Sequence, residues 1–545
     1  MRFKISDPLN LILIIPFAVV LITPITSLDP FGLPKFLVLV LFVLTYGLYI
    51  IFSFSKSYFN QFSSIYLILG IFVASGLSSI LNSSTPITEN IYGNFGRQTG
   101  FFTYISLSIL LLAFALLSEP KVLKHTTNVI IFALVSNLIY SFFQILKLDP
   151  INWSIAVAPV FGFFGNPNFL TAFLGMTSVI FVAQLFDNSI LGIRKAISVL
   201  WIVLTLFVLF RSGSQQGIFI FFITNCVYVF YLLSINLRAK RLKPFFLIVV
   251  TTLFSYGALD LLQRSPWKSI FYEETISFRG DFWRAGLKMA SSNPFTGVGF
   301  AGYKDNYLIY RDLKSALRIK REDNVDSAHN LFIDMLASGG LVLFIIILVL
   351  FIYISIVGLI VMNDSKLRNN HIAIFYAIWI GYLSQALISV ESLGIAIVGW
   401  ISGGLIIGTY LKGKPGCVPI NISKLKVPKK VFLLGMVFTN LVCTPLILVD
   451  SKLKSGIENG NLAQVVSTTK NWPQDTGRIN FITKVLIDSK LYDEALIVAR
   501  EAVEFNPHNF NAWSNLSLIP GISMNEKLRA EEYKSLLNPY YKLSK

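Results

Sequence analysis

Four arginines and one histidine stand out in this sequence because they lie in short polar stretches between long apolar runs. Arg97 lies in GNFGRQTG, Arg211 in RSGSQQG, and Arg279 and Arg284 in SFRGDFWRAG. His329 ends the longest polar interval, just before the chain becomes apolar again. A guanidinium group at a membrane surface suits a phosphate or pyrophosphate, because its planar fork pairs with two oxygens and stays charged. These residues are therefore candidates for an anion site.

Two asparagines in GFFGNPNFL, Asn166 and Asn168, precede another apolar run and are further candidates. Several of the candidates have a purely structural alternative. Arg97 could extend to lipid head groups, the Asn-Pro-Asn turn could break and cap a helix, and His329 could cap one as well. Glu391 is a lone acid between two apolar runs, and a structural role is favoured for it.

The composition identifies the surroundings of these residues as a membrane. The chain has 545 residues, of which 54% are hydrophobic and 14% charged, with a mean hydropathy of +0.66. A soluble protein carries nearer a quarter of charged residues. The net charge of +17 lies mostly in short loops, which is typical of membrane orientation rather than nucleic-acid binding. The three cysteines have no paired spacing, so no disulfide or metal framework is expected.

Thirteen apolar stretches are predicted to be transmembrane helices, which makes this an all-α polytopic membrane protein. The first resembles a signal peptide, but it lacks a small-x-small cleavage site and another apolar stretch follows at once, so we expect it to be retained. The stretches lie near residues 8–27, 35–54, 63–82, 100–118, 126–147, 168–186, 196–211, 215–236, 245–263, 329–361, 371–390, 393–411 and 431–449.

The distribution of Lys and Arg predicts the orientation. With the N-terminus in the cytoplasm, the inward ends and loops carry 19 of these residues and the short outward loops carry 4. Positive residues gather on the cytoplasmic side. We therefore expect an extracytoplasmic loop at 264–328 between the ninth and tenth spans, where residues 264–330 hold 11 Lys/Arg and 8 Asp/Glu. Residues 416–450 are expected to be a basic cytoplasmic linker and the last span.

The C-terminal segment, 451–545, is predicted to be an extracytoplasmic helical module. Ala495, Ala502 and Pro507 have the spacing of a tetratricopeptide repeat, and the Asn538-Pro539 pair lies 32 residues after Asn506-Pro507. About three repeats are normally needed for a stable solenoid. We therefore expect a small module that leans on the membrane domain or on a partner protein.

The polar interval resembles a known family. FRGDFWRAGLKMASSNPFTGVGFAGY followed by SAHNLFIDMLASGGL is similar to the shared domain of O-antigen ligases and O-antigen polymerases. The matching features are Arg-x-x-x-Trp from Arg279, Asn-Pro-x-x-Gly-x-Gly, and His329-Asn330 followed by a small-Gly pair. The Arg211 turn resembles the family's Ser-Arg-Gly element with Phe210 in place of serine, and GNPN before a span is similar too. The resemblance covers roughly residues 1–415.

This resemblance implies a GT-C-type enzyme that uses neither a metal nor another cofactor. It would sit in the cytoplasmic (inner) membrane and move a glycan from undecaprenyl pyrophosphate to a glycan, lipid or protein acceptor at the outer face. Arg211 and Arg279 would hold the pyrophosphate, and His329 would act as general base or share the phosphate. The remaining candidates would contact substrate, namely Arg97, Asn166, Asn168, Arg284 and Asn330.

Three other functions stay open at this point. The first two are a polysaccharide polymerase and a protein O-oligosaccharyltransferase of the same superfamily. The third is a transporter of inorganic carbon, a function from a different class. A transporter should place ionisable residues at mid-membrane near broken helices. The predicted spans contain almost none, and the unusual charges gather at one face. The sequence therefore favours the ligase interpretation over transport.

Overall fold

The computed structural model describes residues 8–24, 27–151, 153, 160–236, 239–261, 274–318, 324–414 and 428–544. Every element assigned within these ranges is helical, which confirms the predicted all-α class. Parts of the predicted long loop (264–273 and 319–323), the linker from 416 to 427, and Cys417 lie outside the described residues.

The helices of the membrane part and its loops are α1 (Pro8–Ala18), α2 (Leu33–Phe42), η1 (Val43–Gly47), α3 (Leu48–Asn82), α4 (Ile87–Tyr92), α5 (Phe101–Leu117), α6 (Pro120–Ile145), η2 (Gly162–Phe164), α7 (Pro167–Thr177), α8 (Val179–Phe186), α9 (Gly192–Arg211), α10 (Gln215–Ile235), η3 (Ala239–Leu242), α11 (Lys243–Leu261), α12 (Glu274–Ser292), α13 (Tyr303–Tyr310), α14 (Leu313–Arg318), α15 (Leu331–Asn363), α16 (Asn370–Ile388) and α17 (Leu393–Lys412). The chain continues with α18 (Lys429–Glu458), and then with the C-terminal helices, which are α19 (Leu462–Ser467), α20 (Thr476–Asp488), α21 (Tyr492–Phe505), α22 (Phe510–Leu518), α23 (Met524–Leu537) and η5 (Tyr541–Ser544).

Ten helical segments of the described chain are long and apolar enough to cross a membrane. Each coincides with one of the thirteen predicted stretches, so the polytopic membrane character is confirmed. The other three stretches fall on α1, α5 and α11, of which α5 is a shorter apolar helix of 17 residues. The count of thirteen therefore stays a prediction. The ten segments are Leu33–Ser53, Asn60–Asn82, Pro120–Ile145, Pro167–Phe186, Gly192–Arg211, Gln215–Ile235, Leu331–Asn363, Asn370–Ile388, Leu393–Lys412 and Lys429–Glu458.

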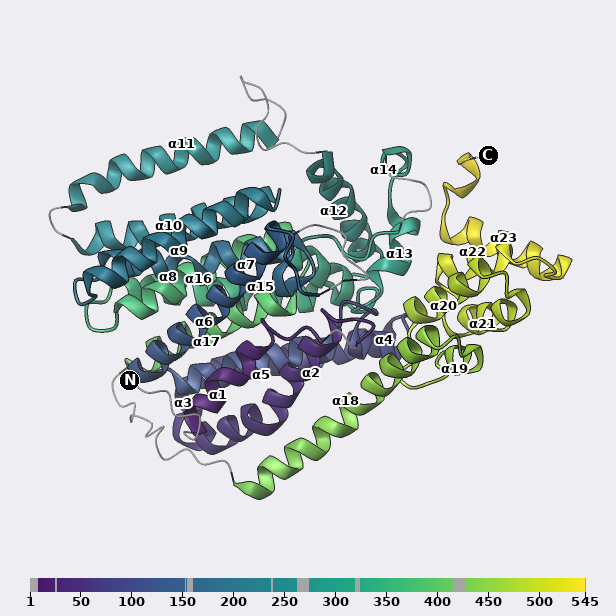
Figure 1. Ribbon diagram of the computed structural model, residues 1–545, viewed down its shortest axis with the longest axis horizontal. Helices are drawn as coiled ribbons and strands as arrows, with labels where there is room; N and C mark the ends of the chain where they lie inside the picture. The colour runs from purple at the N-terminus through teal and green to yellow at the C-terminus, as the bar shows by residue number, and fades with distance from the viewer. Residues whose placement is uncertain are drawn as a thin grey trace.

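The centre of the bundle is α17, whose apolar window is 89% buried. It packs against α5, α16 and α15, while α10 packs against α7 and α16. Glycines allow this close packing, because a Cβ at Gly404 would lie 2.3 Å from the carbonyl oxygen of Leu111 on α5. At one end of the bundle α4, the loop helices α12–α14 and the C-terminal helices gather (Figure 1), and we call this end the loop face.

Helix α15 is broken where the sequence predicts one continuous span. Gly340 has φ 71° and ψ −168°, a conformation that is essentially restricted to glycine. The break exposes backbone groups that the 293–300 segment pairs. The N–H groups of Val298 and Gly299 donate to the carbonyls of Ala337 and Ser338 at 2.8 and 2.9 Å. In return the N–H of Leu341 donates to the carbonyl of Pro294 at 2.7 Å. We call this pairing of 294–299 with 337–341 the backbone ladder.

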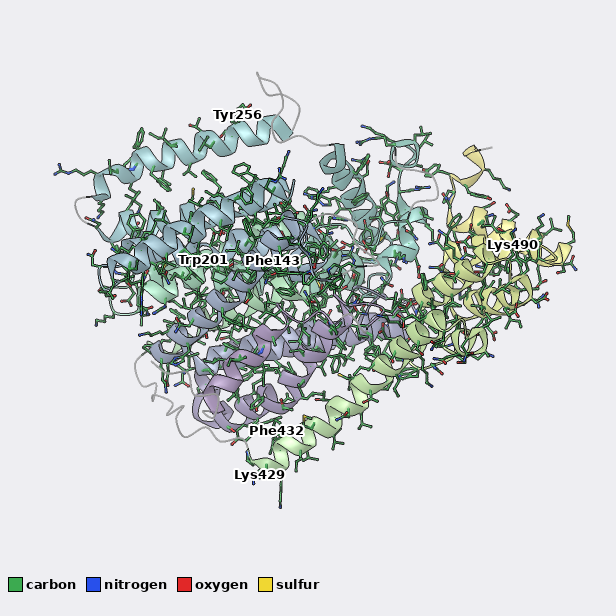
Figure 2. All side chains as sticks on the ribbon, viewed as in Figure 1. Phe143, Trp201, Tyr256, Lys429, Phe432 and Lys490 are labelled. Carbon is green, nitrogen blue, oxygen red and sulfur yellow. The ribbon has the colours of Figure 1, made fainter. Side chains whose placement is uncertain are left out.

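Helix α18 leads from the bundle to the C-terminal helices (Figure 1). Figure 2 labels Lys429 at the start of this helix and Lys490 among the C-terminal helices, between α20 and α21. The helix runs on past the predicted boundary at residue 450 to Glu458. Buried Asp450 accepts hydrogen bonds from the Ser27 hydroxyl and the Leu28 N–H, both at 2.8 Å, so α18 is anchored to the segment before α2.

The backbone ladder predicts that Gly340→Ala destabilises the protein. An added Cβ would lie 2.5 Å from the Pro294 carbonyl oxygen. The alanine would also have to adopt a backbone conformation that costs about 1–3 kcal/mol. The apparent unfolding temperature in detergent should fall by several degrees. Gly70→Ala is the matched control, because nothing lies within 4 Å of a Cβ there and alanine favours a helix. Equal unfolding temperatures for the two variants would contradict the described break.

Candidate active site

An ion pair joins the turn after α4 to the segment before α15. Arg97 Nε lies 2.7 Å from Asp326 Oδ2. Arg97 belongs to the turn between α4 and α5, where its N–H donates to the carbonyl of Asn94 at 3.0 Å, and Asp326 lies just before α15. Burial raises the pKa of Asp326, but the charge and hydrogen bond of Arg97 lower it by more, so the net shift of the pKa is downward. The carboxylate therefore stays ionised beside the guanidinium.

His329 lies three residues after Asp326, in a strained turn. Its φ is +55°, a conformation that is uncommon for a residue with a Cβ. Its N–H donates to the Ser327 hydroxyl at 2.9 Å, and the Ala328 N–H donates to the Asp334 carboxylate at 2.6 Å. The imidazole ring packs 5.5 Å from the ring of Phe282 on α12, measured between centroids. Residues on both sides of the turn therefore fix its direction.

The charge state of His329 follows from this position. Burial lowers its pKa to about 4; Asp326 acts in the opposite direction, while the positive charges of Arg279 and Arg97 lower it as well. The imidazole is therefore neutral near pH 7 and able to accept a proton. These interactions also show that His329, Arg97 and Arg279 lie close enough to act on one another electrostatically.

A small polar cavity of about 40 Å³ borders this cluster. One of its acids is Glu391, between α16 and α17, which accepts a hydrogen bond from the Tyr382 hydroxyl at 2.9 Å. Burial raises the pKa of Glu391 to about 7 against the opposing effect of its hydrogen bonds. The cavity is lined by Asn94, Arg97, Thr99, Tyr104, Phe300, Tyr303, Asp326, Ser327, Asp334, Met335, Ser338, Val390 and Glu391.

The Asn-Pro-Asn turn connects the Arg97 region with the Arg211 turn. Asn166 caps α7 by accepting the Asn168 N–H at 2.8 Å, as the structural alternative proposed. Asn168 Oδ1 accepts the hydroxyl of Ser214 at 2.7 Å, which ties this turn to the one that follows Arg211. The Arg97 guanidinium carbon lies 6.0 Å from the ring centroid of Phe169, the next residue after Asn168. The two asparagines thus hold neighbouring elements together.

The remaining candidates differ in how far they are engaged. Arg211 is exposed at the end of α9, and within the described chain no hydrogen bond or ion pair involves its side chain. Arg284 forms ion pairs with Asp281 and, at 2.8 Å, with Asp312. Asn330 caps α15, and its amide donates to the Leu387 carbonyl of α16 at 3.0 Å. The structure therefore gives Arg284 and Asn330 positions that stabilise the loop and the helix start.

Sequence reasoning assigned no site role to Asp334 or Tyr303 and named Glu391 only as a residue with a structural role. Asp334 lies one turn into α15 and holds the Ser327–Ala328 turn. Tyr303 lines the cavity and donates its hydroxyl to the Phe282 carbonyl at 2.6 Å. The sequence did contain a signal for Asp334, because it is an acid in the first turn of the apolar run that follows His329. Within the described ranges, no three His, Cys, Asp or Glu side chains are grouped so as to hold a metal ion.

Comparison with known protein families decides the assignment. Residues 200–348 match the family model described as O-antigen ligase, whereas no curated protein matches the chain. This match over part of the chain supports the O-antigen ligase superfamily. The resemblance seen in the sequence is thereby confirmed for the superfamily, while the tetratricopeptide character of the C-terminal helices stays a prediction.

The O-antigen ligase match contains most of the site and leaves out one wall. It runs from the middle of α9, which ends at Arg211, to the middle of α15, and so includes Arg279, His329 and the whole backbone ladder. Arg97 and the Asn-Pro-Asn turn precede the match, yet they contact its residues directly or through one neighbour. The candidate site therefore also includes segments from earlier in the chain.

The surroundings of His329 predict its titration. It should titrate near pH 4, because burial and two nearby arginines disfavour the charged imidazolium. Arg279→Gln removes one of these positive charges and should raise the midpoint. Histidine-selective NMR in detergent would measure it, with the signal assigned by its loss in His329→Gln among the 4 histidines of the chain. A midpoint near 6.5 would show that the imidazole is not buried as described.

Proposed function

We propose that this protein transfers a glycan from undecaprenyl pyrophosphate to an acceptor at the outer face of the cytoplasmic membrane, as an O-antigen ligase does. The observation that carries the proposal is the cluster of Arg97, Asp326, Arg279 and a neutral His329 beside a polar cavity, in a chain with an O-antigen ligase domain. A pyrophosphate leaving group and a hydroxyl nucleophile need cationic groups and a proton acceptor, which are the group types found here.

In the proposed step the acceptor hydroxyl oxygen attacks the anomeric carbon of the donor sugar. A new C–O bond forms while the bond from that carbon to the pyrophosphate oxygen breaks. The hydroxyl proton passes to His329, and undecaprenyl pyrophosphate leaves with the bonding electron pair. Arg279 and Arg211 would stabilise the negative charge that develops on the leaving oxygen. Preorganised charges of this kind usually supply a large share of transition-state stabilisation.

Arg97 has a different place in this proposal because Asp326 already balances its charge. Its guanidinium has further donors besides Nε, so it can bind one substrate oxygen while keeping the ion pair. Arg211 is exposed at the end of α9, so its guanidinium is accessible to an incoming pyrophosphate. We propose that these guanidinium groups supply the charge compensation and that the transfer needs no metal ion.

Ligase and polymerase chemistry would differ only in the acceptor, so the lipid-linked glycans that accumulate after deletion of the gene separate them. A ligase deficiency leaves finished polymer on the carrier, whereas a polymerase deficiency leaves single units. Accumulation of neither species, with an underglycosylated protein instead, would point to a protein O-oligosaccharyltransferase. We propose the ligase, because the matched family is described in these terms.

Substitutions of the proposed catalytic residues test the chemistry. Arg211→Lys and Arg279→Lys keep the charge but lose the planar fork. Each should reduce the rate of glycan transfer by about 30- to 1000-fold, the effect of losing a transition-state contact of about 2–4 kcal/mol. His329→Ala should have a similar effect. Purified variants at matched expression would be assayed, and the wild-type rate should survive excess EDTA.

Arg500→Lys is the matched control, because Arg500 pairs with Glu526 on the surface of the C-terminal helices. It should transfer glycan at the wild-type rate. Wild-type rates for both Arg211→Lys and His329→Ala would show that these residues do not perform the transfer. Loss of activity in EDTA, with recovery on adding Mg²⁺ or Mn²⁺, would contradict metal independence.

Labelling with an impermeant thiol reagent tests the proposed orientation. In a variant without Cys226, Cys417 and Cys443, we would place single cysteines at the exposed positions Lys314 and Asn459. Both should react on intact spheroplasts because the charge distribution predicts that the loop face lies outside. A cysteine at exposed Lys366, between α15 and α16, should react only after lysis. The reverse pattern would place the loop face in the cytoplasm.

A further inference from the structure

The C-terminal helices share a hydrophobic core with the loop helices rather than hanging from α18. One continuous cluster of buried side chains includes Met289 of α12 and Tyr307 of α13 together with Ile479 of α20 and Trp513 of α22. The same cluster contains Ala328, the residue before His329. Residues distant by about two hundred positions in sequence are therefore packed as one body at the loop face (Figure 1).

The start of α20 is hydrogen-bonded to the segment from Glu89 to Arg97, which we call the Arg97 wall. The Glu89 carboxylate of α4 accepts the Thr476 N–H at 2.5 Å. The neighbouring Asp475 carboxylate accepts the Phe95 N–H at 3.0 Å, two residues before Arg97. Glu89 is 2% exposed, so this contact is sealed from solvent. The turn that places Arg97 beside Asp326 is thus fixed by hydrogen bonds from the C-terminal segment.

A second set of contacts holds α13 at both of its ends. Asp305, in the first turn, accepts the side-chain amides of Asn506 at 2.7 Å and Asn509 at 2.6 Å. Arg311, the C-cap, is 2% exposed and donates to the amide oxygen of Asn538 at 3.2 Å. Asn506 and Asn538 are the two asparagines whose Asn-Pro pairs suggested a repeat in the sequence. In the structure both face the same short helix.

Asn506 links the Arg97 wall to α13 through its side-chain amide group. Its Nδ2 donates to Asp305 Oδ2 and, at 3.1 Å, to Thr476 Oγ1, while the Thr476 N–H is bound by Glu89. The side chain is 1% exposed. A single buried amide thus connects α4, α13 and the C-terminal helices. Burial and the neighbouring charges of Asp475 and Asp305 raise the pKa of Glu89 well above its usual value, so a further carboxylate would be poorly tolerated here.

Helix α13 transmits this position to the catalytic residues. The Tyr303 hydroxyl donates to the Phe282 carbonyl of α12 at 2.6 Å, and the Tyr307 ring packs edge-on against the Phe282 ring at 5.8 Å. The Phe282 ring contacts the His329 imidazole at 5.5 Å. Arg279 lies on the same helix, one turn before Phe282. A shift of α13 would therefore move α12, and with it the arginine and the histidine.

We infer that the C-terminal helices are a positioning part of the active site, in which Asn506 sets the spacing between the Arg97 wall and the His329–Arg279 wall. The inference rests on the proposed transfer function. Reacting groups held in place by a rigid surround gain most of their rate from alignment, and a displacement of about 1 Å costs about 100-fold. The C-terminal helices should accordingly affect kcat more than the KM for either substrate.

A reciprocal exchange of side chains tests the bridge. Asn506→Asp places a carboxylate against Asp305 and should reduce kcat by about 10- to 100-fold. Asp305→Asn should also reduce it, because two amide donors then compete for one acceptor oxygen. The double variant restores an amide-to-carboxylate hydrogen bond and should recover most of the rate. Asn515→Asp is the control and should leave kcat unchanged, since among the described residues the Asn515 side chain bonds to Asn480 of the C-terminal helices, at 3.4 Å.

Hydrogen–deuterium exchange of the same purified full-length proteins gives a readout independent of activity. Asn506→Asp should increase exchange in peptides covering both 86–98 and 303–311, and the double variant should reverse the increase. If Asn506→Asp is too unstable to purify, Asn538→Ala breaks the Arg311 contact instead and should give the same exchange in 303–311 with a lower kcat.

The outcomes separate the two proposals. Increased exchange with an unchanged kcat, or exchange no different from Asn515→Asp, would overturn the inference whatever the site residues do. A reduced kcat that the exchange of partners does not recover would also overturn it. The proposed transfer function fails instead when His329→Ala and Arg211→Lys keep the wild-type rate, a result that leaves the exchange measurements unaffected.

Discussion

The structure depends on a requirement of the protein backbone, that polar groups at a helix break inside a membrane protein must find partners. Helix α15 leaves the helical conformation at Gly340, and the 294–299 segment pairs the groups that this break frees. The carbonyl of Ser338 also accepts the Ser79 hydroxyl of α3 at 2.7 Å, and the carbonyl of Val298 accepts the Thr85 hydroxyl at 2.8 Å. The loop is thereby fixed to α15 by main-chain hydrogen bonds, and two side-chain hydroxyls of the bundle bind the same segments.

The position of the site follows from this ladder. The segment from Leu331 to Gly339 is held at its end by the ladder and at its start by Asn330, whose amide reaches the carbonyl of Leu387. His329 therefore directly precedes a short helical segment that is fixed at both ends. On the other side of the backbone ladder, α12 ends just before Pro294, so Arg279 and Phe282 are positioned by the same pairing. One backbone feature thus helps to position both the histidine and the arginine.

The sequence predicted the elements of the site better than their arrangement. Apolar runs reveal membrane helices because the bilayer demands about 20 apolar residues, and scarce charges between them are conspicuous. The ladder has no comparable signal, since it joins main-chain groups about 40 residues apart and only the glycines Gly297 and Gly340 hint at it. The engagement of Arg284 with Asp281 was visible as a pair three residues apart on one helix, whereas its contact with Asp312 required the fold.

The two Asn-Pro pairs have contacts that their spacing in the sequence could not reveal. Their spacing suggested punctuation between repeats, but buried asparagines must satisfy an amide with both donors and acceptors. Asn506 does so with partners from α13 and α20, and Asn538 with the guanidinium of Arg311. Each contact replaces water around a buried polar group, so losing one partner leaves the other unsatisfied at a cost of about 1–3 kcal/mol. Because both contacts converge on α13, their effects on the site should not be independent, and the C-terminal helices act on α12 and His329 as one body.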